Sequence, residues 1–112
     1  MAKWLLVVES HCADPAREQE YHDYYDKTHV PDIFKTKEFV KVTRYELQTV
    51  TKSAGSKDKY LAIYEIEGDD LDAVMAKHNA NMKRVASEGR LSKLVETTSR
   101  AIYKQMSSHT AE

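Results

Sequence analysis

Lys3-Trp-Leu-Leu-Val-Val-Glu-Ser10 is the stretch that decides the fold, because its apolar side chains occupy both alternating faces of a strand. A strand of this kind is expected to be buried on both sides. Lys59–Glu67 has the same character, with one face formed by Tyr60, Ala62, Tyr64 and Ile66 and the other by Leu61 and Ile63. The sequence therefore predicts a sheet that is covered on both faces.

The segment after the first strand is predicted to be a helix. Asp14 suits the N-cap of this helix, and Pro15 suits its first turn. We expect the helix to end at about residues 28–29, because Pro31 restricts Val30 to an extended conformation.

The remaining elements follow from alternation, helical spacing and turn-forming residues. They are a turn or short helical piece at Asp32–Thr36, a strand at Phe39–Val50, a polar loop at Thr51–Lys59, a helix that starts at Leu71 and is capped by Gly89, and a strand at Leu94–Met106. In the second strand, strict alternation predicts one face that carries Phe39, Lys41, Thr43, Tyr45 and Leu47. No internal boundary is visible, so residues 1–106 are expected to form one domain and residues 107–112 a flexible tail.

The order of elements, β-α-β-β-α-β, is that of the ferredoxin-like fold. We therefore predict an α+β domain with an antiparallel four-stranded sheet and two helices on one face. The other face stays open, and each large apolar side chain left in water forfeits roughly 1.5–3 kcal/mol. A second copy of the same sheet is the simplest cover, which predicts a homodimer, a dimeric α/β barrel with room for a small ligand. The alternative is a monomer with a modestly apolar open face.

Composition limits the classes of function. The 112 residues fit a single domain, and 41% hydrophobic with 31% charged residues is typical of a folded globular protein. A formal net charge of -1 argues against nucleic-acid binding and gives no support to binding at an anionic membrane. The longest strongly apolar run, Trp4–Val8, is too short to span a bilayer, and no secretory signal is visible. Cys12 is the only cysteine, so we expect no internal disulfide and a cytoplasmic location.

The segment Glu20–Asp32 carries the side chains best suited to chemistry. Four of them are three or four residues apart and so share one helix face, namely His22, Tyr25, Asp26 and His29. An imidazole can take and give a proton near neutral pH, and a tyrosine hydroxyl can donate a hydrogen bond to a developing enolate or phenolate oxygen. Asp32 is expected to fold back on His29.

Each candidate also has a structural interpretation. His22 suits a solvated helix surface, Asp26 a surface ion pair, and His29 a helix end where the dipole stabilises an imidazolium. Two further aromatic residues fit either a core or a pocket wall, namely Tyr45 and Tyr64. No metal is expected, because the helix lacks the glutamate base of the zinc-protease motif and a defined third ligand.

The run Tyr24-Tyr25-Asp26-Lys27-Thr28-His29-Val30-Pro31-Asp32, followed by residues 39–45, resembles the EthD-like branch of the dimeric α/β-barrel superfamily. The resemblance implies a ferredoxin-like protomer and a dimer whose sheets close a barrel. The superfamily includes polyketide cyclases, muconolactone-type isomerases, haem-degrading and cofactor-free monooxygenases, aldoxime dehydratases and members with no known reaction. By position, the resemblance makes His29 the leading functional residue, surrounded by Tyr24, Tyr25, Asp26 and Asp32.

The functional prediction is a cofactor-independent lyase, cyclase or isomerase acting on a small aromatic or polyketide-like molecule. In this hypothesis His29 is the general acid or base, Asp26 or Asp32 orients it, and Tyr25 or Tyr45 binds the substrate oxygen. The remaining candidates are His22 for catalysis, and Tyr24 and Tyr64 for substrate binding. A non-catalytic accessory protein that holds a small apolar ligand is the first alternative. The second is a haem-binding or haem-degrading protein with His78, which otherwise suits a core position, as the axial ligand.

Overall fold

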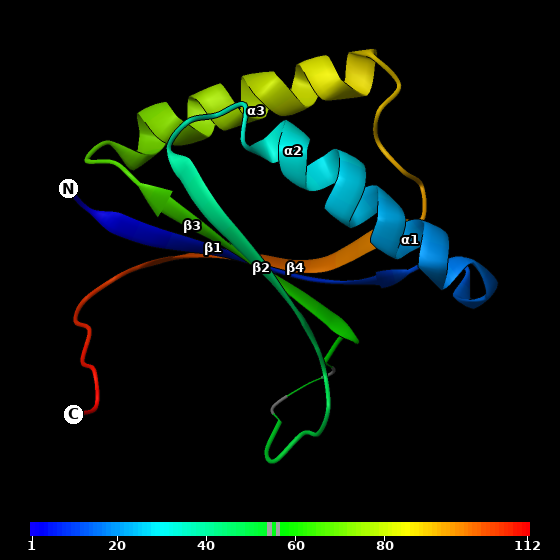
Figure 1. Cartoon of the computed structure of the whole chain (residues 1–112), viewed down its shortest axis with the longest axis horizontal. Helices are drawn as coiled ribbons and strands as arrows, with labels where there is room; N and C mark the ends of the chain where they lie inside the picture. Colours follow the sequence, from blue (N-terminus) through cyan, green and yellow to red (C-terminus); the bar gives the residue numbers. More distant parts are fainter. Residues whose placement is uncertain (54, 56) are drawn as a thin grey trace.

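Strand β1 (Lys3–Cys12) lies inside an antiparallel sheet, as its two apolar faces predict. The computed structural model describes residues 1–53, 55 and 57–112, so Ala54 and Ser56 of the predicted polar loop lie outside the described residues. The other strands are β2 (Phe39–Glu46), β3 (Tyr60–Glu67) and β4 (Val95–Lys104), and the sheet order is β2-β3-β1-β4. Neighbouring strands pair in the antiparallel sense, and Figure 1 shows the strands as one sheet. This arrangement confirms the predicted ferredoxin-like topology.

The helices lie together over one face of this sheet (Figure 1). The helical segments are η1 (Pro15–Arg17), α1 (Glu18–Tyr24), the π-helical turn η2 (Tyr25–His29), α2 (Val30–Ile33) and α3 (Leu71–Ser87). The core lies between the helices and the sheet, and its most enclosed large side chains include Tyr21, Ile33, Ile66 and Val85. In the part of the chain that the structure describes, no helix combines the length and the apolar character that a membrane crossing requires.

The prediction that Pro31 ends the first helix is wrong. Val30 has helical dihedral angles, φ -60° and ψ -48°, and the helix continues as α2 to Ile33. The cause is the π-helical turn, in which the Val30 N–H donates to the carbonyl of Tyr25, five residues back. This turn holds one more residue than an α-helical turn and is wider. It therefore makes room for the proline ring, which would otherwise clash with the preceding turn.

Strand β2 departs from strict alternation near its start. The register against β3 shifts between Phe39 and Lys41, so Phe39 is buried on the helix side of the sheet with Val42 beside it. A β-bulge of this kind inserts one residue and reverses the faces that follow it. Tyr45 consequently lies on the opposite face and is 53% exposed. Both edge strands are also shorter than predicted, ending at Glu46 and Lys104.

The sheet face away from the helices is partly apolar. Register places on it the apolar side chains of Leu5, Val7, Tyr45, Leu61, Ile63 and Tyr103. Two ion pairs across neighbouring strands accompany them, Lys41 with Glu65 at 4.0 Å and Lys3 with Glu67 at 3.9 Å. The open face therefore carries both apolar and charged side chains.

An ion pair between a buried carboxylate and an exposed arginine fixes the end of the first helix. Asp32 is 2% exposed, and its carboxylate accepts hydrogen bonds from Nε and Nη2 of Arg90 at 3.0 and 2.6 Å. The backbone carbonyl of Asp32 also accepts a hydrogen bond from Asn81 on α3, at 2.8 Å. Paired in this way, Asp32 ties α2 to α3 and to the segment that leads into β4.

Replacing Arg90 tests whether its ion pair with Asp32 stabilises the fold. Arg90→Gln leaves the Asp32 carboxylate buried without its cation, so we expect the urea concentration at the unfolding midpoint to fall. Arg17→Gln is the matched control, because Arg17 and Glu20 form an exposed pair whose loss is expected to leave the midpoint nearly unchanged. Equal losses in the two variants would show that Asp32 does not depend on Arg90.

Candidate functional site

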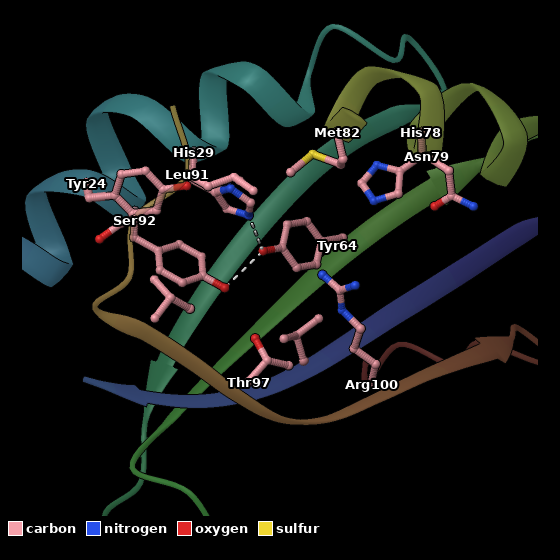
Figure 2. A pocket seen from close by; sticks show the side chains of 13 residues that line it. Tyr24, His29, Tyr64, His78, Asn79, Met82, Leu91, Ser92, Thr97 and Arg100 are labelled. Atoms are coloured by element: carbon pink, nitrogen blue, oxygen red, sulfur yellow. Dashed lines mark hydrogen bonds between the residues drawn. The ribbon is translucent and has the colours of Figure 1, made fainter. Parts of the chain in front are cut away.

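A cavity of about 340 Å³ lies between the helices and the β4 side of the sheet. Its walls come from the end of α1, from η2, from α3, from the segment before β4 and from three strands. They include Val8, Tyr24, Tyr25, His29, Tyr64, His78, Asn79, Met82, Leu91, Ser92, Val95, Thr97 and Arg100. Figure 2 shows the labelled members of this set surrounding one space. Because Leu91, Thr97 and Arg100 are exposed, the cavity opens to solvent along β4.

The centre of the cavity wall is a chain of three hydrogen-bonding side chains. Nε2 of His29 lies 3.2 Å from the hydroxyl of Tyr64, which in turn lies 3.0 Å from the hydroxyl of Tyr25. Tyr25 and His29 are the first and last residues of the π-helical turn, and Tyr64 stands on the central strand β3. The same turn that accommodates Pro31 therefore aims both side chains at one hydroxyl group.

Burial determines the charge states of His29 and Tyr64. Burial, followed by the positive charge of Arg100, lowers the pKa of His29 to about 4. Burial also raises the pKa of the Tyr64 phenol far above its usual range. Nδ1 of His29 is buried and has no hydrogen-bond partner among the described residues. At neutral pH the site therefore holds the neutral imidazole of His29 against the neutral phenol of Tyr64.

Arg100 brings a positive charge to the other side of the cavity. Figure 2 shows its side chain rising from β4 towards Tyr64 and His78. Its orientation depends on a bulge in β4: Ser99 pairs with Glu9, but Thr97 pairs with the next residue of β1. With one residue inserted, Thr97 and Arg100 both face the helices although they are three apart in sequence.

His78 is buried like a core residue and also lines the cavity. It is 3% exposed, and its ring stacks on Phe39 with 4.7 Å between ring centroids. Burial, with a further contribution from Arg100, lowers its pKa. The Phe39 ring therefore covers one face of His78, while the imidazole still borders the cavity.

Two predicted site residues join a separate cluster around Arg44. The guanidinium donates to Asp26 at 3.1 Å and to Nδ1 of His22 at 3.0 Å. Since an arginine only donates, Nδ1 of His22 is the acceptor, and Nε2 carries the hydrogen towards the Tyr60 hydroxyl at 3.2 Å. The cluster adjoins the cavity wall at Tyr25, whose ring lies 4.4 Å from the guanidinium carbon of Arg44.

The structure corrects the expected orientation of His29 by a carboxylate. Asp32 pairs with Arg90 and Asp26 with Arg44, so neither forms a hydrogen bond to His29. Tyr45 lies on the far face of the sheet and does not line the cavity. Within residues 1–53, 55 and 57–112, no three histidine, cysteine or acidic side chains gather as a metal-ion site requires.

Tyr24, Tyr25, His29 and Tyr64 are the predicted site residues that the structure brings together. Residues that sequence reasoning assigned no site role complete the wall, chiefly Arg100 and Asn79. Alternation in β4 alone does not reveal the bulge that turns Arg100 inward, and Asn79 follows a histidine expected in the core. Arg44 stood in the quoted motif, but no pattern in the sequence indicated its partners.

The low pKa of His29 predicts a pH dependence of stability. The unfolded imidazole binds its proton near pH 6.5 and the folded one near pH 4, so the unfolded chain holds more protons between these values and stability falls as the pH falls. We expect the wild type to lose up to about 3 kcal/mol more than His29→Gln between pH 7 and pH 4 in urea unfolding. Met82→Leu, which changes the same wall without a titrating group, is expected to match the wild type. Parallel curves for the wild type and His29→Gln would contradict the assignment.

Comparison with known proteins supports the fold. No protein-family model matches the sequence, and no curated protein matches it significantly. HapK from Hahella chejuensis superposes with a TM-score of 0.63 at 12% identity, over 97% of this chain and 98% of that one. A provisionally assigned monooxygenase from Shewanella loihica PV-4 gives 0.60 at 13% identity, over 96% and 99%.

An ethyl tert-butyl ether D (EthD) family protein from Bacillus halodurans C-125 gives a TM-score of 0.55 at 19% identity, over 95% of this chain and 100% of that one. At these identities the comparisons establish the shared fold. The chain, whose sheet topology is ferredoxin-like, therefore shares its fold with these three proteins.

Proposed function

We propose that this protein is a cofactor-independent acid–base enzyme of lyase, cyclase or isomerase type, acting on a small aromatic or polyketide-like molecule in the cavity beside His29. The observation that supports this best is the enclosed hydrogen-bonded chain of His29, Tyr64 and Tyr25 facing the guanidinium of Arg100. A proton-moving group, hydrogen-bond donors and a fixed positive charge border the same partly apolar space.

The chemistry requires the tautomer of His29 that carries its hydrogen on Nδ1. In that form Nε2 accepts the hydroxyl hydrogen of Tyr64. A proton leaving an acidic substrate group then passes to the Tyr64 oxygen as the Tyr64 hydrogen moves to Nε2 of His29. In this arrangement the Tyr25 hydroxyl donates to the Tyr64 oxygen. The products are an imidazolium and a substrate anion, and the anion is stabilised by Arg100 and by the Tyr64 hydroxyl, which now carries the proton taken from the substrate. The reverse transfer returns the proton to another substrate atom.

The remaining predicted residues have supporting roles in this proposal. Tyr24 forms part of the wall that holds the ligand. His22 and Asp26 hold Arg44 over the Tyr25 ring, which makes them positioning residues. Asp32 keeps α2, and with it the end of the π-helical turn, in place.

A non-catalytic small-ligand-binding accessory protein is the second candidate. One observation favours it: an imidazole whose pKa is about 4 is a weak base, and Nδ1 of His29 is enclosed. In this case the cavity holds its ligand through the tyrosine hydroxyls and Arg100 without turnover. Binding without conversion distinguishes it from the enzyme.

Proton transfer on a simple lactone tests the enzyme. We expect the wild type to accelerate isomerisation of α-angelica lactone to its conjugated isomer, followed by ultraviolet absorbance. His29→Gln and Tyr64→Phe each break the chain and are expected to lower kcat by about 10²–10⁴-fold. Tyr103→Phe is the control, because this tyrosine is exposed on the opposite face of the sheet. No acceleration by the wild type, together with measurable binding of a phenol such as salicylate, would favour the accessory protein.

We further propose that two chains pair through their open sheet faces to form a dimeric barrel. Apolar side chains on that face, such as Val7, Ile63 and the exposed Tyr103, support the pairing because water leaves them when a second sheet covers them. The cavity beside His29 lies on the helix side, so this pairing leaves its opening along β4 clear of the second sheet.

Sedimentation velocity checks the pairing. At micromolar concentration we expect the wild type to sediment with twice the mass of one chain, and Ile63→Glu to sediment as a single chain because it puts a charge at the centre of the face. Phe34→Glu introduces the same charge at an exposed apolar residue of the helix layer and is expected to remain paired. A single-chain mass for the wild type would rule the pairing out.

A further inference from the structure

A second cavity, of about 320 Å³, adjoins the cavity beside His29 and shares His78, Asn79 and Arg100 with it. Its other walls are apolar and consist of Leu6, Met75, Ala101 and Ile102. The two cavities therefore adjoin beneath α3, with His78 and Asn79 above and Arg100 rising from β4 (Figure 2). We refer to these two neighbouring cavities together as the cleft.

The charge at the junction is positive and unpaired. Each of the chain's other arginines lies within ion-pair distance of a carboxylate: Arg17, Arg44, Arg84 and Arg90. In the part of the chain that the structure describes, Arg100 has no such partner, and neither cavity is lined by aspartate or glutamate. A guanidinium facing two neutral imidazoles favours an anion from outside the chain.

A second polar group at the junction also lacks a partner. Nδ1 of His78 is buried without a hydrogen bond among the described residues, although the residue is only 3% exposed. Buried polar atoms are nearly always satisfied in folded proteins, so this nitrogen leaves the imidazole with unused hydrogen-bonding capacity. The unpaired charge of Arg100 and the imidazole of His78 both belong to the walls of the two cavities.

We propose that the cleft takes an elongated aromatic anion. Its hydroxylated ring lies beside His29 and Tyr64, its single acidic group meets Arg100, and an apolar tail extends between Met75 and Ile102. This inference rests on the proposed function, because the ring occupies the same site. It adds the charge of the ligand, the position of that charge and the direction of the tail.

Three probes separate the parts of this ligand. Salicylate carries the ring and the carboxylate, 6-pentylsalicylate adds the tail, and 3-pentylphenol keeps the tail but lacks the carboxylate. By calorimetry we expect 6-pentylsalicylate to bind at least about tenfold more tightly than salicylate, because burying a few methylene groups supplies this gain. We expect 3-pentylphenol to bind about ten- to a hundredfold more weakly than 6-pentylsalicylate, because it forms no charge-assisted hydrogen bond with Arg100.

Three variants test which residues produce the preferences for the carboxylate and for the pentyl group. Arg100→Gln is expected to bring the affinities of 6-pentylsalicylate and 3-pentylphenol within about threefold of each other. Lys104→Gln removes the same charge from the same strand, outside both cavities, and is expected to keep the preference for the carboxylate. Ile102→Asp places a charge in the tail region and is expected to abolish the gain from the pentyl group.

The outcomes distinguish this inference from the proposed function. Salicylate binding or lactone turnover without a gain from the pentyl group overturns the tail, and equal binding of 3-pentylphenol and 6-pentylsalicylate by the wild type overturns the anion. Failure of all three probes to bind overturns the inference as a whole, whatever the lactone assay shows. Conversely, the expected binding pattern without lactone turnover supports the inference and overturns the enzyme alone.

Discussion

The removal of His29 from water is the constraint on which the site depends. Packing of the π-helical turn against β3 encloses the imidazole beside Tyr64, and the fixed charge of Arg100 further disfavours its protonation. The site therefore contains one lasting positive charge, on arginine, and a neutral proton acceptor. A ligand that becomes negative is stabilised by the arginine. The imidazole can accept the ligand's proton because it is not already protonated. This separation of roles allows one small cavity to bind an anion and to exchange protons.

One-residue insertions give the fold its functional geometry. The π-helical turn directs Tyr25 and His29 to one hydroxyl and lets the helix pass Pro31. The bulge in β2 buries Phe39 beneath His78, and the bulge in β4 turns Arg100 inward. Each insertion interrupts a regular pattern: the π-helical turn and the β4 bulge place side chains at the cavity, and the β2 bulge places Phe39 against the wall residue His78. The regular elements supply the frame, with Asp32 and Arg90 closing it at the end of the first helix.

The sequence was sufficient to predict the frame and part of the site. β1 and β3 were predicted because each is a short, almost continuous apolar run with apolar side chains on both faces, and the order of elements and the sheet followed from them. His29, Tyr25 and Tyr64 were identified because polar aromatic groups on a core-facing surface are unusual. The role of Asp32 was wrong because its partner, Arg90, lies 58 residues away. Arg100 and the helical passage through Pro31 were missed for a related reason: bulges and π-turns depend on tertiary packing and leave no periodic signal.

The ionisation state of His29 is the most direct measure of this account, because a neutral, enclosed imidazole underlies both the proton transfer and the demand for an anion at Arg100. Nitrogen-15 nuclear magnetic resonance of histidine-labelled protein reports the charge and the tautomer of each ring as the pH is lowered. The account predicts that His29 stays neutral at pH 6 and takes up a proton only near pH 4, as its lowered pKa requires. A His29 signal that titrates at its ordinary value near 6.5, or above it, would contradict the account.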